Sequence, residues 1–382
     1  MKVALSFTTC NRRGGVERVM YECARFLAGR GHQVHVLAGN WQDDVESFAQ
    51  CHRIHHLKRP WFLRGLSYRR HCAEFLKTFE CDALNTHGVV CPAGGVMWVH
   101  SLHAAWLERG RSMLGGSSWR RMKRRLNPLH PILLRLEEQH FGRRAYKRLF
   151  ATTPVVRDDL ARFYGVPAGD VTIVPNGFNP DEFSADRRTE RRHEMRRQLG
   201  LQPDQIALLF VANELERKGY RTILGALRRL GRRDLRLVVV GRPPAKQIMQ
   251  LAAAHGVADL VIAAGPTAAV ADFHAAADLF VLPTQYEAFC LAILESLGSG
   301  LPVVTSSVPG AADAIQPGVN GELVRDPNND EELAAVLSAM LDHDTLAAYS
   351  ARTPQTAVEY QWPRVLIRYE QVLEGKVPAH VA

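Results

Sequence analysis

The sequence predicts an α/β protein with two doubly wound parallel-sheet domains, and three observations point to that fold class. Short apolar segments alternate with amphipathic helical segments along the chain, which is typical of parallel strands joined by right-handed crossovers. The alternation starts again near residue 200. The 382 residues also suffice for two or three domains of roughly 100–200 residues each.

In the first half, Lys2–Phe7 is an apolar run that predicts a buried first strand. A helix is expected after the turn Gly14-Gly15, because apolar residues then follow at helical spacing as far as Leu27. Further strands of this half are expected at Gln33–Leu37, Cys81–Asn85, Val96–Val99 and Arg148–Thr152.

In the second half, a new series of apolar runs predicts another parallel sheet. Its strands are expected at Ile206–Val211, Leu235–Val240, Leu260–Ala263, Leu279–Leu282 and Pro302–Thr305. We therefore expect a first domain over residues 1–175 and a second over 201–355. The polar, arginine-rich residues 176–200 are expected to be a linker, and residues 356–382 a C-terminal helix that packs back on the first domain.

Composition excludes several classes of protein. With 46% hydrophobic and 23% charged residues, the chain is not expected to be disordered, collagenous or a coiled coil. No apolar run reaches the roughly 18–20 residues that a membrane-spanning helix needs. The seven cysteines lack metal-type spacing, which favours a reducing compartment. We expect a cytoplasmic protein, with peripheral attachment to the inner face of the cytoplasmic membrane as a further expectation.

The positive charge is concentrated in the first half. Residues 1–175 carry 27 Lys and Arg against 14 Asp and Glu, whereas the rest carry more acidic than basic residues. This asymmetry predicts an anionic partner for the first half, either a membrane surface or a charged substrate. Nucleic acid is not expected, because no recognised nucleic-acid motif accompanies the charge. Residues 106–125, glycine- and arginine-rich, are either an exposed insertion that contacts this partner or a solvated loop.

Two polar loops follow expected strands. Gly14-Gly15 opens a helix, where glycines allow a ligand to approach the backbone and the helix N-terminus favours phosphate. The loop lacks the full dinucleotide-binding pattern, so a packing turn is an equal alternative. Arg217 and Lys218 follow Ile206–Val211 and stand at the carboxyl edge of the second sheet, where they could hold a diphosphate or be a solvated pair.

The strongest pattern is a pair of glutamates after the strand Leu279–Leu282. Glu287 stands before a helix expected to begin near Phe289, and Glu295 lies inside that helix. The first N–H groups of such a helix, those of Phe289, Cys290 and Leu291, would face an anion. The two carboxylates could accept hydrogen bonds from sugar or ribose hydroxyls. The alternative is that Glu287 only interacts with the dipole of the first helical turn and that Glu295 is an ordinary surface residue.

This pattern resembles a known family. Seven residues separate Glu287 from Glu295, and Gly300-Leu-Pro302 follows them. This arrangement resembles the donor-binding signature of retaining glycosyltransferases of family four, which have the GT-B fold. The Gly14-Gly15 loop and Lys218-Gly219 match that family in order. The resemblance implies two Rossmann-like domains that face a cleft, the first on the acceptor side and the second binding the nucleotide-sugar donor.

The resemblance also implies roles for the residues. Glu287 would contact the transferred sugar and act in catalysis, and Glu295 would bind the ribose of the donor. The donor diphosphate would be held by Gly14, Gly15, Arg217, Lys218, Phe289, Cys290 and Leu291. A catalytic histidine next to the sugar would be His100, with His87 and His103 as competitors. Glycine is usual in the family at the place of Cys290, and arginine at that of Asn213.

Within the family, Arg217-Lys218-Gly219 and the segment around His140 loosely resemble the lipopolysaccharide core glucosyltransferases. The expected activity is therefore retaining transfer of a hexose from a nucleoside diphosphate sugar, UDP-glucose first, to a glycolipid or polysaccharide at a membrane. GDP-mannose as donor, a small soluble acceptor, and an epimerase or hydrolase on the same fold are the alternatives. We expect no cofactor and no metal, because the one Asp-x-Asp, Asp342–Asp344, is interpreted as a helix-end feature.

Overall fold

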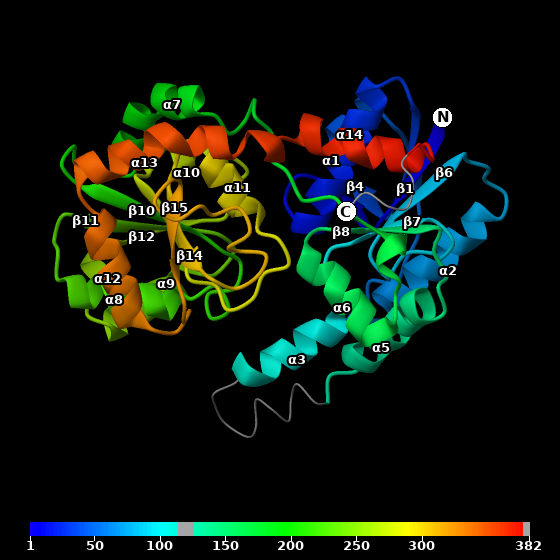
Figure 1. The fold of residues 1–382 in the computed structure, drawn as a ribbon, viewed down its shortest axis with the longest axis horizontal. Helices are drawn as coiled ribbons and strands as arrows, with labels where there is room; N and C mark the ends of the chain where they lie inside the picture. The colour runs from blue at the N-terminus through cyan, green and yellow to red at the C-terminus, as the bar shows by residue number, and fades with distance from the viewer. Residues whose placement is uncertain (114–125, 377–382) are drawn as a thin grey trace. The chain divides into compact units, whose positions relative to one another are not determined.

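The computed structural model describes residues 1–113 and 126–376, and it divides the chain into two compact units. Unit 1 contains Met1–Asn176 and Pro363–Ala382, and unit 2 contains Gly177–Trp362. Each unit has one parallel sheet with helices packed around it (Figure 1). This confirms the predicted fold class, an α/β protein with two parallel sheets.

The sheet of unit 1 has seven parallel strands in the order β5-β3-β1-β6-β7-β8-β9. Along the chain they are β1 (Lys2–Ser6), β3 (Gln33–Ala38), β5 (Gln50–Arg53), β6 (Ala83–His87), β7 (Val96–Val99), β8 (Arg148–Ala151) and β9 (Val171–Ile173). A separate short pair joins β2 (Thr9–Cys10) to β4 (Asn40–Trp41). The helices are α1 (Gly15–Gly29), α2 (Arg64–Leu76), α3 (His103–Met113), α5 (Leu129–Glu137), α6 (Pro154–Tyr164) and α14 (Trp362–Leu373).

The sheet of unit 2 has six parallel strands in the order β12-β11-β10-β13-β14-β15. They are β10 (Ile206–Val211), β11 (Leu235–Val240), β12 (Val261–Gly265), β13 (Leu279–Leu282), β14 (Val303–Ser306) and β15 (Gly321–Val324). The helices are α7 (Ala185–Gln198), α8 (Tyr220–Leu230), α9 (Ala245–Ala254), α10 (Val270–Ala276), α11 (Leu291–Gly298), α12 (Asp330–Met340) and α13 (His343–Thr356). Single helical turns lie at Asp43–Ser47, Trp61–Leu63, Glu138–Gly142, Ala168–Asp170, Ala258–Leu260 and Val358–Tyr360.

The central strands are apolar on both faces because helices cover both sides of each sheet. All residues of β13 and β14 are buried, and so are five of the six residues of β10. A single large core, formed by these strands and the helices around them, holds unit 2 together. No helix in the described part of the chain is long and apolar enough to cross a membrane.

The expected linker over residues 176–200 is wrong in its main part. Ser184 caps α7, which fills most of that stretch and packs against α10 within unit 2. Arg192 and Arg196 form ion pairs with the buried carboxylate of Asp278 at the start of β13. The arginines made the segment look like a solvated linker, but they bind the C-terminal end of a neighbouring helix and its flanking carboxylate.

The C-terminal helix α14 belongs to unit 1, where its side chains contact the turn between α1 and β3 and the strand β6. The Tyr369 hydroxyl donates a hydrogen bond to Asn85 of β6 at 3.0 Å. Glu370 accepts hydrogen bonds from Arg30 at 3.2 Å and pairs with His32 at 2.9 Å, just before β3. Unit 1 is therefore completed by a segment that follows the whole of unit 2 in sequence.

Candidate functional site

Each sheet has one position where its strand order reverses, and polar loops follow the strands there. In unit 2 the order runs outward in opposite directions from the neighbours β10 and β13. Ligands of open parallel sheets bind at the carboxyl ends of the strands at such a position. Arg217 and Lys218 follow β10, and Glu287 follows β13. The structure thus brings these three predicted residues to one place.

Backbone contacts hold the two loops together. Gly219 has a φ of +81°, and a Cβ there would lie 2.1 Å from the carbonyl oxygen of Pro283. Any larger residue would therefore push the loops apart. On the other side, the N–H of Gln285 donates to the carbonyl oxygen of Arg217 at 2.9 Å. The sequence Arg217-Lys218-Gly219 is thereby fixed against the loop that carries Glu287.

The carboxylate of Glu287 is the centre of a small charged cluster. It accepts hydrogen bonds from the ammonium of Lys218, from the guanidinium of Arg217 at 3.2 Å and from the hydroxyl of Thr284 at 3.1 Å. The Lys218 and Glu287 side chains are only 13% and 9% exposed. Arg217 also pairs with Glu214, an exposed carboxylate on its outer side. Two cations are thus preorganised around one buried acid.

The cluster keeps both cations charged. Burial disfavours the Lys218 ammonium, but the neighbouring Cys290 and Glu287 outweigh this effect and raise the pKa of Lys218 above its ordinary value. Burial also disfavours the Arg217 guanidinium, and Glu287 and Glu214 raise its pKa in the same way. A partly buried pair of permanent cations at a strand-order reversal is suited to a strongly anionic ligand.

The helix after Glu287 starts later than expected. It begins at Leu291, not near Phe289, and the N–H of Cys290 donates to the carbonyl oxygen of Gly310 at 3.0 Å. Gly310 has a φ of +81° and lies against the carbonyl groups of Glu287 and Ala288, which keeps this segment extended. In this structure the N–H of Cys290 is thus used within unit 2, and the phosphate contact through it stays a prediction.

The side chain of Cys290 lies inside the cluster. Its sulfur is 3.9 Å from the Lys218 ammonium. Burial raises the pKa of the thiol to about 11, although Lys218 acts in the opposite direction. Leu291 opens the first turn of α11, and Glu295 lies one turn further on with only 5% of its surface exposed.

The glycines of unit 1 lie at the equivalent position of the first sheet. Gly14 caps α1 and Gly15 is its first residue, directly after β1 and β2. A Cβ on Gly15 would meet nothing within 4 Å, and one on Gly14 would meet only the flexible carboxylate of Glu17. Neither glycine has a positive φ. Internal packing therefore does not explain why both positions are glycine.

The three candidate histidines fall into two groups. His87 ends β6 and its Nδ1 lies 3.2 Å from Nε2 of His100, which follows β7. The two rings stack against each other and against Trp98. Burial lowers the pKa of His100 to about 3 and that of His87 well below its ordinary value, so both imidazoles are neutral. His103 instead starts α3 and its ring contacts His130 at 2.9 Å.

Sequence reasoning missed several partners of the cluster. The hydroxyl of Thr284 donates to Glu287, and the carbonyl of Tyr286 accepts from Arg217. Glu214 pairs with Arg217. A signal for Glu214 was present, because it lies three residues before Arg217, a spacing at which oppositely charged side chains pair in a helical turn. Asn213, where the family often has arginine, accepts a hydrogen bond from the N–H of Arg242 at 3.2 Å.

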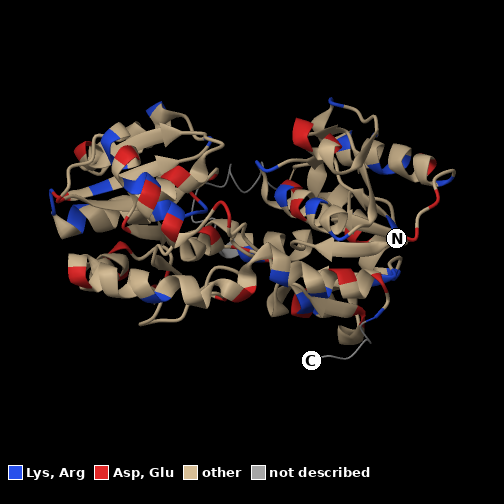
Figure 2. Cartoon of the chain, turned by 90° about the horizontal axis from the view of Figure 1, so that it is seen from above, with Lys and Arg blue, Asp and Glu red and all other residues tan. Residues whose placement is uncertain are grey.

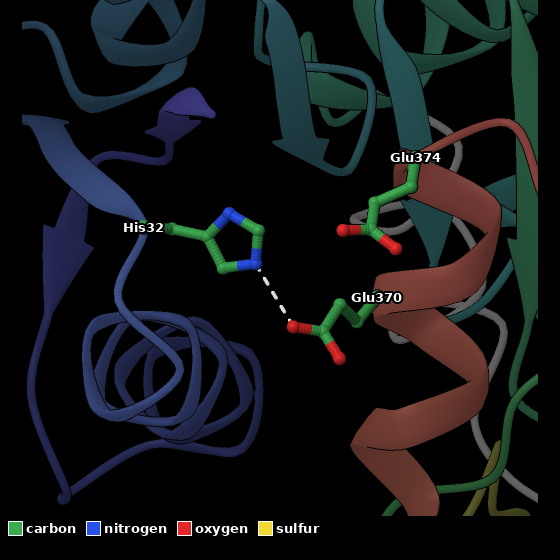
Figure 3. A group of neighbouring side chains, drawn as sticks. All are labelled: His32, Glu370 and Glu374. Atoms are coloured by element: carbon green, nitrogen blue, oxygen red, sulfur yellow. Dashed lines mark hydrogen bonds and ion pairs between the residues drawn. The ribbon is translucent and has the colours of Figure 1, made fainter.

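Among the described residues, one group offers three metal-type ligand atoms close together. It consists of His32, Glu370 and Glu374, whose side chains point toward one another (Figure 3). Its carboxylates are already paired with cations, Glu370 with Arg30 and Glu374 with Lys376. Asp342 of the Asp-x-Asp caps α13 by accepting hydrogen bonds from its first N–H groups, which confirms the helix-end interpretation.

Comparison with known proteins decides the family. Residues 13–182 match the model described as Glycosyltransferase Family 4, and residues 191–355 match that of Glycosyl transferases group 1. The chain belongs to glycosyltransferase family 4. Together the two matches cover most of both units, and they confirm the resemblance that the glutamate pair indicated.

Several curated relatives of this family 4 glycosyltransferase are named D-inositol 3-phosphate glycosyltransferase. That of Thermobispora bispora is 35% identical over 240 residues, which are 59% of this chain and 55% of the relative. That of Geodermatophilus obscurus is 34% identical over 235 residues, 57% of this chain and 50% of the relative. The chain thus spans about half the length of these relatives.

Solved structures show the same fold along the whole chain. WaaG, described as a glycosyltransferase involved in lipopolysaccharide biosynthesis, has a TM-score of 0.82 at 24% identity. The match covers 98% of this chain and 100% of the WaaG chain. Anabaena Alr3699/HepE, solved with UDP and glucose, has a TM-score of 0.76 at 18% identity, covering 98% of this chain and 100% of its own. The family 4 glycosyltransferase therefore has the GT-B fold.

Proposed function

We propose that this glycosyltransferase moves a hexose, with retention of anomeric configuration, from a nucleoside diphosphate sugar to a glycolipid or glycan acceptor. The observation that carries the proposal is the cluster of Arg217, Lys218 and Glu287 at the strand-order reversal of unit 2. The family supplies the reaction type, and the cluster supplies the charges which that reaction needs.

Each residue of the cluster has a task in this reaction. The diphosphate gains negative charge as it leaves the sugar, and Arg217 and Lys218 stabilise that charge. To do so they must share their hydrogen bonds between Glu287 and the phosphates. Glu287 then accepts hydrogen bonds from sugar hydroxyls, and Glu295 from the ribose. No carboxylate is assigned as a covalent nucleophile, so the departing phosphate takes the acceptor proton on the same face of the sugar.

Unit 1 carries three further residues to which the family resemblance gives a role, Gly14, Gly15 and His100. The glycines leave room for the diphosphate to approach the N-terminus of α1, where N–H groups and the helix dipole favour an anion. The neutral imidazole of His100 is suited to a hydrogen bond with a sugar hydroxyl and not to ion pairing.

UDP-glucose is the proposed donor, supported by the fold shared with a protein solved with UDP and glucose. A phosphorylated glycolipid at a membrane is the proposed acceptor, supported by the basic first half of the chain and by the name of WaaG. We propose that no metal is needed, since two protein cations would face the diphosphate. GDP-mannose remains the second donor to test.

A small phosphorylated acceptor is a second candidate. The curated relatives are named for D-inositol 3-phosphate, a soluble compound whose phosphate would also suit a basic acceptor-side unit. An epimerase or hydrolase on the same fold would act on the donor alone. These alternatives differ in what consumes the donor, so product analysis separates them.

Calorimetric titration with UDP, GDP and ADP, with and without Mg²⁺, tests the proposal. Tight binding of UDP without metal supports it, and Lys218→Ala should weaken that binding while Lys246→Ala, an exposed lysine on α9, should not. Nuclear magnetic resonance of the product would then show the anomeric configuration. Binding of none of the three nucleotides would overturn the proposal, and release of free glucose from UDP-glucose without an acceptor would favour a hydrolase.

A further inference from the structure

One surface segment of unit 1 combines a strong positive charge with a complete lack of acidic residues. Residues 47–73 contain no Asp or Glu, although the whole chain has 39 acidic against 48 basic residues. The six cations of this segment are Arg53, Lys58, Arg59, Arg64, Arg69 and Arg70. All except Arg69 are exposed. Figure 2 shows Lys and Arg in blue and Asp and Glu in red along the ribbon.

The same segment exposes apolar side chains. Trp61 is 57% exposed and Leu57 is 49% exposed, and they are two of the five large hydrophobic residues exposed in the described part of the chain. They flank Lys58, Arg59 and Pro60, all exposed, and Trp61 begins the short helical turn that leads into α2. Two exposed apolar side chains and two exposed cations thus lie within five consecutive residues.

The rest of the segment is firmly attached to the core. Ile54, Tyr68 and Cys72 are buried together in one hydrophobic cluster under this surface. The N–H of Leu57 donates to the hydroxyl of Ser67 at 3.1 Å, which ties the exposed loop to the first turns of α2. The outward position of Leu57 and Trp61 is therefore built into the fold of unit 1.

We propose that residues 53–70, hereafter the basic-aromatic segment, dock unit 1 on the surface of an anionic lipid bilayer. Tryptophan is favoured at the membrane–water interface because one end of its ring is apolar and the other carries an N–H group. Lys and Arg next to it bind lipid phosphates. This pairing fits a bilayer better than a nucleic acid, which offers no apolar layer for Leu57 and which would need several aromatic rings to stack bases.

The inference rests on the proposed function in one respect, because that function explains why the enzyme would bind a membrane, where the acceptor is. It also differs from the expectation drawn from the sequence, which placed the contact at residues 106–125. Most of that stretch lies outside the described residues. The basic-aromatic segment is a separate surface, formed by the loop before α2 and the first half of that helix.

Sedimentation of the full chain with extruded vesicles tests the inference. Vesicles of phosphatidylcholine with 30% phosphatidylglycerol should bind the protein, and pure phosphatidylcholine should bind it far less. The triple variant Lys58→Gln, Arg59→Gln, Arg64→Gln should bind about 100-fold more weakly, because each cation near anionic lipid contributes about fivefold. Trp61→Ala should lower the affinity about tenfold, as expected when a large aromatic side chain no longer enters the interface.

Matched controls isolate the surface. Arg228→Gln, Arg233→Gln, Lys246→Gln removes the same charge from exposed positions of unit 2, and Ile367→Ala removes an exposed apolar side chain of α14. Neither control should change vesicle binding by more than about twofold. Circular dichroism melting curves of all variants should overlap with that of the unchanged chain, because every substituted side chain is exposed.

Three results would overturn the inference. One is equal binding to neutral and anionic vesicles, and another is wild-type binding by the triple variant while Arg120→Gln, Arg121→Gln, Lys123→Gln loses it. The third is binding to a single-stranded oligonucleotide through this segment without vesicle binding. UDP titration of the triple variant should be unchanged, so a failure of vesicle binding leaves the donor proposal intact, and loss of UDP binding in the unchanged chain leaves this inference intact.

Discussion

At the scale of single residues, the decisive feature is one carboxylate that holds two cations. Glu287 is surrounded by Lys218, Arg217 and Thr284, and all three donate to the same oxygen. A diphosphate would compete for these donors. The charge state of residue 287 should therefore have opposite effects on nucleotide binding and on turnover.

Glu287→Gln should lower kcat by about 10²–10³-fold, the usual effect of losing a transition-state electrostatic contact. Affinity for UDP should rise or stay constant, because the cations lose an internal competitor. Steady-state kinetics and UDP titration measure the two quantities. Glu214→Gln is the matched control, since it also removes a carboxylate from Arg217 but one that is exposed. An unchanged kcat in the Glu287→Gln enzyme would show that Glu287 does not act in the site.

Gly15→Ala separates packing from ligand binding. The new methyl group would meet nothing within 4 Å, so the melting temperature should not fall and can rise, because alanine is the better helix former. Activity should nevertheless drop at least tenfold if the diphosphate approaches this backbone. Gly29→Ala at the other end of α1 also enters open space and should leave activity unchanged. Equal activity of both variants would place the ligand elsewhere.

At the scale of elements, α7 shows how arginines can belong to a packed helix. The carboxylate of Asp278 accepts hydrogen bonds from Arg196 at 3.1 Å and from the N–H of Ala207 at 2.8 Å, and it also pairs with Arg192. It thus joins α7, β10 and the start of β13. A segment that appears solvated from its composition is a structural part of unit 2.

Asp278→Asn should lower the free energy of unfolding of unit 2 by about 3 kcal/mol, because it leaves the buried Arg196 and the partly exposed Arg192 without a counter-charge. Urea denaturation measures the loss. Glu194→Gln, which removes the exposed partner of Arg191 on the same helix, should cost less than about 0.5 kcal/mol. If the two variants were equally stable, α7 would behave as the linker that its composition suggested.

The paired histidines at the ends of β6 and β7 should make the stability of unit 1 depend on pH. The folded chain keeps His100 neutral down to a pKa of about 3, whereas an unfolded chain protonates it near pH 6.5. The unfolded state then binds more protons, so stability present above pH 6.5 is lost as the pH falls. Between pH 7 and pH 5 this residue should account for about 1–2 kcal/mol of the loss.

Substitution checks that assignment. His100→Gln should flatten the pH dependence of unit 1 by that amount, as measured by urea denaturation and hydrogen exchange of β6 and β7. His193→Gln, a substitution on α7 of unit 2, should leave the dependence of unit 1 unchanged. An identical slope in wild type and His100→Gln would show that burial does not control this histidine.

At the scale of the whole molecule, unit 1 is discontinuous. The chain leaves it after Asn176 and returns with Pro363. The return is fixed by Tyr369 and Glu370, which contact Asn85, Arg30 and His32 of the first 90 residues. The stability of unit 1 therefore depends on the last helix of the chain.

Glu370→Gln should destabilise unit 1 by about 2 kcal/mol, because a buried carboxylate loses its pairing with Arg30 and His32. Hydrogen exchange of β1 and β3 should become faster, and exchange of β10 and β13 in unit 2 should not. Glu374→Gln, whose partner Lys376 is exposed, should have little effect. Equal effects of the two substitutions would show that Glu370 does not fix the last helix to unit 1.

Much of the fold followed from local patterns. The strands β7, β10, β11 and β13 were expected at the positions where they occur, because buried parallel strands are continuous apolar runs. The expected strand Cys81–Asn85 is shifted to Ala83–His87, and the polar edge strand β5 had no apolar run to mark it. Strand ends and edge strands depend on their neighbours more than on their own side chains.

The sequence by itself determined the two-sheet fold class, the family and the residue types at each loop, because periodicity and motif spacing are properties of the chain. Only the tertiary structure decided which donors each polar group uses. It placed Lys218 and Arg217 on one oxygen of Glu287, directed the N–H of Cys290 to Gly310, and paired two arginines of α7 with Asp278. Hydrogen bonds and burial join residues from distant parts of the chain, and local pattern carries no record of those partners.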